Sequence, residues 1–279
     1  MKFHARPLLR LGSIFVLTLT LIWSFAYFAP GNSLRAVSAQ STPPSGSFGF
    51  LANVWLAPQS SDSGTAILGV MNFDGEGNVT GSLTFQRGST STKAAQTFVG
   101  TLTGTYSSNP DGTGSATVTF GGALTFTFAM VVADGGQSLQ LVGTHLMGGD
   151  ISGSVADGFA RAGQSGSLKG SYGFQLNNSP LPAGTIGVAN FDGAGNISAS
   201  FTFVGVGTDP SQPPVANGTL TGTYSINADG SGTINFPVQP GQSASSAFAF
   251  VITDGGSGFL LLQTDGTGNN VSFGTARLQ

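Results

Sequence analysis

The chain of 279 residues contains no cysteine, and charged residues make up only 8% of it. The absence of cysteine excludes disulfides, a lipid-anchoring cysteine and thiolate metal ligands. Only one of the two histidines, His145, follows residue 40, so a metal site built from histidines is excluded as well. We therefore predict neither a metal nor a cofactor. With 39% hydrophobic residues, including 22 phenylalanines, the composition favours β-strands around a core over disorder.

Basic residues are also scarce, and four of the nine precede residue 40. The remaining part carries five basic and twelve acidic groups, a net charge of −7. Such a balance offers no attraction to a phosphate backbone, so we predict no nucleic-acid partner.

The N-terminus has the pattern of an export signal. Lys2, Arg6 and Arg10 form a basic region, an apolar stretch follows from Ser13 to Ala29, and Val37-Ser38-Ala39 supplies small residues before a cut ahead of Gln40. An uncleaved membrane anchor is the alternative, since 17 apolar residues are near the lower limit for a span. We predict a signal peptide over 1–39 and a secreted, periplasmic or cell-surface bacterial protein with no membrane span after cleavage.

The rest of the chain is an internal repeat. Gly69-Val-Met-Asn-Phe-Asp-Gly-Glu-Gly-Asn78 returns 118 residues later as Gly187-Val-Ala-Asn-Phe-Asp-Gly-Ala-Gly-Asn196, and Gly100-Thr-Leu-Thr-Gly-Thr-Tyr106 returns at the same offset. These recurrences predict a linker over 40–45, a first domain over 46–161, a second linker over 162–168 and a second domain over 169–279.

Each domain is predicted to be all-β, because short alternating segments separated by turns recur at regular spacing. The first copy shows eight such segments, near 46–53, 65–73, 79–86, 99–107, 114–120, 124–133, 138–145 and 153–161. Eight strands joined by short turns favour two tandem antiparallel eight-stranded up-and-down barrels, since closure removes exposed edges. β-Sandwiches are the main alternative. A single 16-stranded membrane barrel is disfavoured by polar faces such as Thr101, Thr103 and Thr105.

Some of the predicted strands are apolar on both faces, for example 66–71 and 126–132. One face of each must point out of the barrel. It can meet the other barrel, a second molecule or a component of the cell envelope.

Alternate connections lie at the same end of such a barrel. At one end all are tight Asp-Gly turns, whereas the loops at the other end are mostly longer and differ between copies, as loops that bind ligands do. At the variable end of the first domain we expect a binding site for a small amphiphilic ligand. The candidates are an aromatic residue, three basic or titratable residues and a methionine: Trp55, Arg87, Lys93, His145 and Met147. The alternative is that the tryptophan covers the core and the bases are solvated.

The Asp-Gly-x-Gly-Asn turns at 74–78 and 192–196 offer oxygen ligands, but too few for the six to eight that Ca²⁺ takes. We interpret them as hairpin turns that need the Asp and Gly conformations. Catalysis has little support, because a Ser-His-Asp arrangement would depend on His145 alone. The sequence therefore predicts a protein that is not an enzyme.

Two short patterns resemble the calycin barrels, meaning lipocalins and avidins. Gly46-x-Phe48 on the first strand and Arg161 on the last recur as Gly170-x-Tyr172 and Arg277. The resemblance implies that each arginine stacks on the aromatic ring and closes one end of its barrel. An anion site is the alternative interpretation of the two arginines. The chain also resembles uncharacterised exported repeat proteins of soil bacteria, which supply a family without a function.

Two functions remain open on the sequence alone. One is capture of a small amphiphilic ligand at the variable end of at least one barrel. The other is a structural or adhesive module at the cell surface, with filled barrels and a cell-envelope component as its partner. Inward-facing glycine and alanine near the mouth would indicate a cavity, and bulky phenylalanine a filled barrel.

Overall fold

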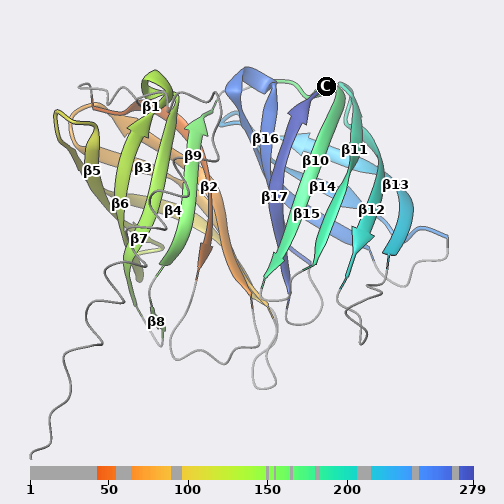
Figure 1. Cartoon of the computed structure of the whole chain (residues 1–279), viewed down its shortest axis with the longest axis horizontal. Coiled ribbons are helices and arrows are strands. Elements are labelled where there is room, and N and C mark those ends of the chain that lie inside the picture. The colour runs from red at the N-terminus through yellow and green to blue at the C-terminus, as the bar shows by residue number, and fades with distance from the viewer. Residues whose placement is uncertain are drawn as a thin grey trace, which may run out of the picture. The chain divides into compact units, whose positions relative to one another are not determined.

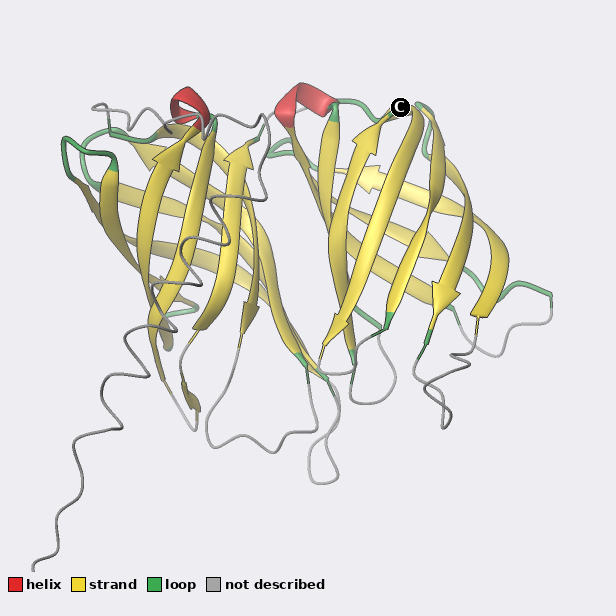
Figure 2. Cartoon of the chain, viewed as in Figure 1, coloured by secondary structure: helices red, strands yellow, loops and turns green. Residues whose placement is uncertain are grey.

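The computed structural model describes residues 43–54, 64–88, 96–148, 151–153, 155–163, 166–179, 183–205, 215–240, 245–265 and 270–279. The predicted signal peptide lies outside the described residues. Nearly all of the described chain is in antiparallel strands, with two short 3-10 turns, η1 (Asp134–Gly136) and η2 (Asp254–Gly256), drawn red in Figure 2.

The first barrel is a sheet of nine strands in which β6 also pairs with β7, so that the sheet turns back on itself (Figure 1). The three-residue β8 pairs only with β7. The strands are β1 (Ser45–Val54), β2 (Thr65–Asp74), β3 (Asn78–Arg87), β4 (Gln96–Ser108), β5 (Thr113–Phe120), β6 (Leu124–Ala133), β7 (Ser138–Gly148), β8 (Ile151–Gly153) and β9 (Val155–Ala162).

The second barrel is a closed ring of eight strands in chain order, with β17 paired to β10. Its strands are β10 (Lys169–Ser179), β11 (Gly184–Asp192), β12 (Asn196–Val204), β13 (Val215–Ile226), β14 (Ser231–Phe236), β15 (Ser246–Thr253), β16 (Gly258–Gln263) and β17 (Val271–Leu278).

The prediction of an all-β fold with two antiparallel barrels, rather than sandwiches, is confirmed. Alternation along the strands explains why sequence patterns located them. On β4, Leu102 and Tyr106 are buried while Thr101, Thr103 and Thr105 are exposed. The strand predicted over 153–161 differs in detail, because the structure divides this region between β8 and β9.

Aromatic side chains and a linker residue close one end of each barrel. In the first barrel the rings of Phe48, Phe73 and Tyr106 pack edge to face, and the Tyr106 hydroxyl donates a hydrogen bond to the Pro44 carbonyl over 2.9 Å.

The second barrel repeats this arrangement with Tyr172, Phe191 and Tyr224, whose hydroxyl donates to the Leu168 carbonyl over 2.9 Å. Leu168 is itself buried. Burial raises the pKa of both Tyr106 and Tyr172.

The two barrels belong to one compact unit, Ala39–Gln279. Outward-facing apolar residues of β1 and β2 pack against those of β15, β16 and β17 in a single buried cluster. Its members are Leu51, Ala66, Leu68, Val70, Val251, Leu260, Leu262 and Val271. The second apolar face of residues 66–71 is therefore explained by contact with the other barrel.

We expect the Leu68→Ala variant to lose roughly 2–5 kcal/mol of unfolding free energy, because Leu68 is 2% exposed in this cluster and truncation leaves a cavity. Val131 also lies on an outer wall but is 39% exposed. Val131→Ala should change the unfolding free energy by no more than about 0.5 kcal/mol. Urea denaturation measures both values, and equal losses would contradict the packing described here.

Candidate functional site

The interior of the second barrel contains a cavity of about 350 Å³. Phenylalanines from five strands form much of its wall: Phe174, Phe201, Phe203, Phe236, Phe248 and Phe259. The volume lies within the ~300–1,000 Å³ range of small-molecule sites. Two wider hollows on the same barrel, of about 830 and 1050 Å³, are bordered by outward residues such as Thr221 and Ile186 and are surface grooves.

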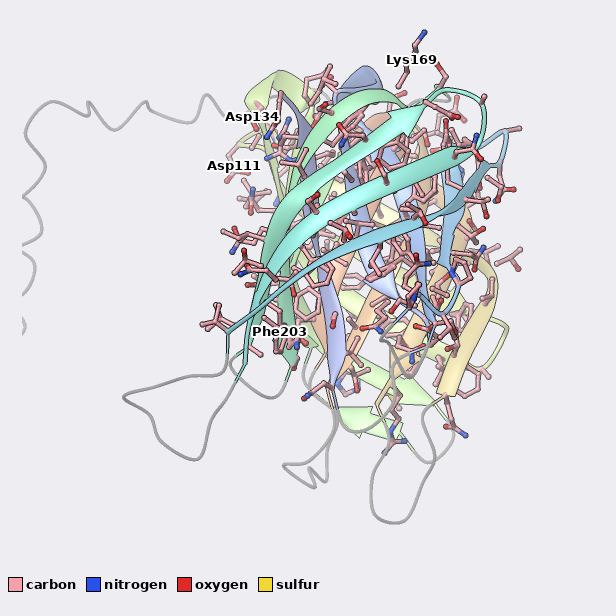
Figure 3. The ribbon with its side chains drawn as sticks, turned by 90° about the vertical axis from the view of Figure 1, so that its right-hand side faces the viewer. Asp111, Asp134, Lys169 and Phe203 are labelled. Atoms are coloured by element: carbon pink, nitrogen blue, oxygen red, sulfur yellow. The ribbon has the colours of Figure 1, made fainter. Side chains whose placement is uncertain are left out.

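Polar side chains gather at one end of the cavity. Strand register shows that they face inward, because directly opposed residues of antiparallel strands share a face. Thr185 lies opposite Phe203, Ser246 opposite Phe236 and Gln263 opposite Phe248. Figure 3 places Phe203 at the end of the barrel away from Lys169, so this polar rim lies opposite the Asp-Gly turns.

Two amides complete the rim, Asn178 on β10 and Asn270 just before β17. The side-chain oxygen of each is buried and accepts no hydrogen bond from the described residues. Such atoms are uncommon in folded proteins, because burying an unpaired polar group costs free energy. None of the described residues that line the cavity carries a charge.

At four of these positions the first barrel holds larger or more apolar side chains, whereas at others it holds smaller ones, such as Val118 in place of Phe236. Met71 lies opposite Phe48 as Ala189 lies opposite Tyr172, so Met71 and Ala189 occupy the same position in the two barrels. Phe126 lies opposite Val118 as Ser246 lies opposite Phe236, so Phe126 and Ser246 are equivalent as well. Met71 and Phe126 are at most 1% exposed.

Two further substitutions follow the same trend. Ile67 occupies the position of Thr185, and Val54 that of Asn178. Both apolar residues are buried. At these four positions the side chains of the first barrel occupy space that the second barrel leaves open.

The binding residues predicted for the first domain are not gathered around a mouth in the described part of the chain. Trp55 and Lys93 lie outside the described residues. His145 and Met147 lie opposite Thr127 and Thr125 on the outer wall and are exposed. Arg87 is half-buried at the end of β3, which does not neighbour β7. The prediction of a ligand site there stays a prediction.

The stacking of arginine on an aromatic ring, which the calycin resemblance implied, is not the arrangement observed. Arg161 lies opposite Gly49, one residue from Phe48, and Arg277 lies opposite Gly173, one residue from Tyr172. Successive residues of a strand point to opposite faces, so the rings enter the core while the arginines lie outside.

Outside the barrels, both guanidinium groups approach one carboxylate. Asp254 lies 3.8 Å from Arg161 and 2.9 Å from Arg277. The three side chains are partly exposed, so this pairing contributes little to stability. It joins the last strand of each barrel through η2.

The repeated Asp-Gly turns are explained by hydrogen bonds within the turn. One oxygen of Asp192 accepts from the backbone N–H groups of Ala194 and Asn196 over 2.6 and 3.0 Å, and the other accepts from the Asn196 amide over 2.5 Å. Asp74 makes the same set with Glu76 and Asn78. Among the described residues no three His, Cys, Asp or Glu side chains gather closely enough to hold a metal ion.

These hydrogen bonds lower the pKa of both carboxyl groups, and the largest cause is the Asn side-chain amide at position 78 or 196, followed by the backbone N–H groups. Because the folded pKa lies below the unfolded value, the stabilisation is complete above the unfolded pKa. It is lost as the pH falls through the folded pKa.

Sequence reasoning missed the residues that define the site. The cavity depends on differences between equivalent positions, such as Met71 and Ala189, within a motif that otherwise recurs. A signal was present, because the aligned copies replace methionine by alanine and phenylalanine by serine on inward positions. Tyr106 and Tyr224, which close the barrels, also stand in a recurring motif.

No family model matches the chain, and no curated protein matches it. Among solved structures it is similar to kievitone hydratase from Nectria haematococca, with a TM-score of 0.35 and 10% sequence identity. The similarity covers 88% of this chain and 94% of that one. A structural similarity this low says nothing about the function of this chain. Within the described residues we find no helix of the length and apolarity needed to cross a bilayer.

We expect Asn196→Ala to raise the pKa of Asp192 toward its usual value, since the largest cause of the lowering is removed. The carboxyl ¹³C shifts of the folded protein, followed from pH 6 to pH 2, measure the titration. The pKa of Asp74 serves as the control and should not move, whereas Asn78→Ala should shift Asp74 alone. An unchanged Asp192 titration in Asn196→Ala would contradict the turn geometry.

Proposed function

We propose that the protein is an exported, non-enzymatic barrel protein that binds a small amphiphilic ligand inside its second barrel, from the end that carries the variable loops. The observation that supports this most directly is the 350 Å³ cavity with phenylalanine walls and a polar rim. Apolar walls with a few oriented polar groups are the usual composition of small-molecule sites.

The chemistry of the cavity favours binding over catalysis. Its described walls carry amides, hydroxyls and hydrocarbon, and none of them is an acid or base that titrates near neutral pH. General acid–base catalysis requires such a group within reach of the substrate. The non-enzymatic part of the proposal is based on this composition.

Export is supported by the basic and apolar pattern of residues 1–39. A ligand carrier outside the cytoplasm is also consistent with a chain that has no cysteine to oxidise. The calycin resemblance supports the proposal through the up-and-down topology of the barrels, without the arginine stack.

A structural or adhesive role is the second candidate, and the filled first barrel favours it for that half of the chain. The inward positions that open the second barrel are occupied there by buried apolar side chains. In this alternative the first barrel serves as a scaffold that covers the β15–β17 wall of the second.

The proposal is tested by filling the cavity with the residue that the first barrel uses. Ser246→Phe places a phenylalanine where the first barrel has Phe126, which is 0% exposed. We expect the native protein to bind the neutral fluorophore N-phenyl-1-naphthylamine. The variant should bind it at least about tenfold more weakly, because the new side chain takes the space of one ring of the probe. Burial of an aromatic ring contributes more than about 1.4 kcal/mol to binding.

The matched control is Ser115→Phe, the same change on the exposed outer wall of the first barrel. It should leave the dissociation constant unchanged. Circular dichroism melting shows whether each variant folds. Equal binding of N-phenyl-1-naphthylamine by the native protein and a folded Ser246→Phe variant would contradict the proposal. An absence of binding to the native protein would contradict it as well.

A further inference from the structure

We infer that the cavity of the second barrel selects an uncharged aromatic molecule that carries a hydroxyl or amino hydrogen-bond donor. This inference rests on the proposed function, and it names the chemical class of the ligand. Three properties of the cavity support it: unpaired acceptors, aromatic walls and the absence of charge among its described lining residues.

The unpaired acceptors are the amide oxygens of Asn178 and Asn270. They lie close together on the wall formed by β10 and β17, because Asn178 pairs with Ser272 and Ser179 pairs with Val271, the residue after Asn270. An amide oxygen accepts hydrogen bonds and cannot donate them. Both asparagines line the cavity.

A donor on the ligand would therefore satisfy atoms that the described residues leave unpaired. A ligand that offers only acceptors would leave the same oxygens buried and unpaired. Sites built to bond a hydroxyl or amino group reject analogues that lack it for this reason.

The shape of the ligand follows from the walls. Phe236 and Phe248 meet at an interplanar angle of 81°, with ring centroids 6.3 Å apart, and both line the cavity. Phe259, at the floor, also contacts Phe191 and Tyr172. Aromatic rings pack favourably against such edges and faces. A compact flat molecule suits this space better than a long flexible chain, whose ordering costs conformational entropy.

The charge of the ligand follows from the lining. None of the described lining residues is ionised, and an unpaired ion in such a cavity pays a large desolvation cost. The ionic cluster of Asp254, Arg161 and Arg277 lies at the end of the barrel that carries the Asp-Gly turns, which is the end opposite the polar rim.

Three naphthalenes of one ring size test the inference by isothermal titration calorimetry. 2-Naphthol has a donor, 2-methoxynaphthalene has only an acceptor, and 2-naphthoate is charged. We expect the native protein to bind 2-naphthol roughly three- to tenfold more tightly than 2-methoxynaphthalene, the factor that one net hydrogen bond provides. 2-Naphthoate should bind more weakly than both.

Two variants assign the preference to the amides. Asn178→Val introduces the residue that the first barrel has at Val54, and Asn270→Leu removes the second acceptor. The double variant should bind both neutral naphthalenes equally. Asn177→Val changes an exposed neighbour on the outer face and should keep the preference.

The outcomes separate the inference from the proposed function. Equal binding of the two neutral naphthalenes by the native protein overturns the inference and leaves ligand binding in place. A preference that survives the folded double variant, or tightest binding of 2-naphthoate, overturns it as well. If neither the naphthalenes nor N-phenyl-1-naphthylamine bind, the proposed function fails together with the inference.

Discussion

Ring closure of the hydrogen-bonded sheet is the constraint on which the rest of the structure depends. The chain has no disulfide and few charges, so each barrel is held by its ladders and its core. Once β10 pairs with β17, the strand number limits the width of the interior. An eight-stranded barrel is just wide enough to be filled by side chains or to hold one small molecule. Inward side-chain volume then decides between the two.

The two barrels differ at four inward positions. In the first barrel Val54, Ile67, Met71 and Phe126 fill the interior, and in the second Asn178, Thr185, Ala189 and Ser246 leave space at the same positions. Both barrels keep the closing aromatic residues at the turn end, where a linker carbonyl accepts a tyrosine hydroxyl. A stable closed end and an altered opposite end allow one barrel to change its interior while the fold is retained.

The fold could be predicted from the sequence because its signals are local. The alternation of buried and exposed residues on β4 and the Asp-Gly turns each depend on neighbouring residues. The recurrence at 118 residues presents each pattern twice. The site could not be predicted, because it depends on which face of a strand points inward. Residues 66–71 are apolar on both faces, since Leu68 covers the other barrel while Ile67 and Met71 fill their own. The prediction that arginine stacks on the aromatic ring was wrong for the same reason. Arg161 lies opposite Gly49, the residue after Phe48, and therefore points to the other face of the sheet.

The central proposal is that a ligand enters the second barrel. Intermolecular nuclear Overhauser effects test it most directly, with methyl-labelled protein saturated by N-phenyl-1-naphthylamine. The account predicts contacts from the probe to the methyl groups of Leu176, Leu220 and Leu261, which line the cavity. Contacts to Ile67 and Met71 in the first barrel, or to the exposed outer-wall residues Ile186 and Val215, in place of these would contradict it.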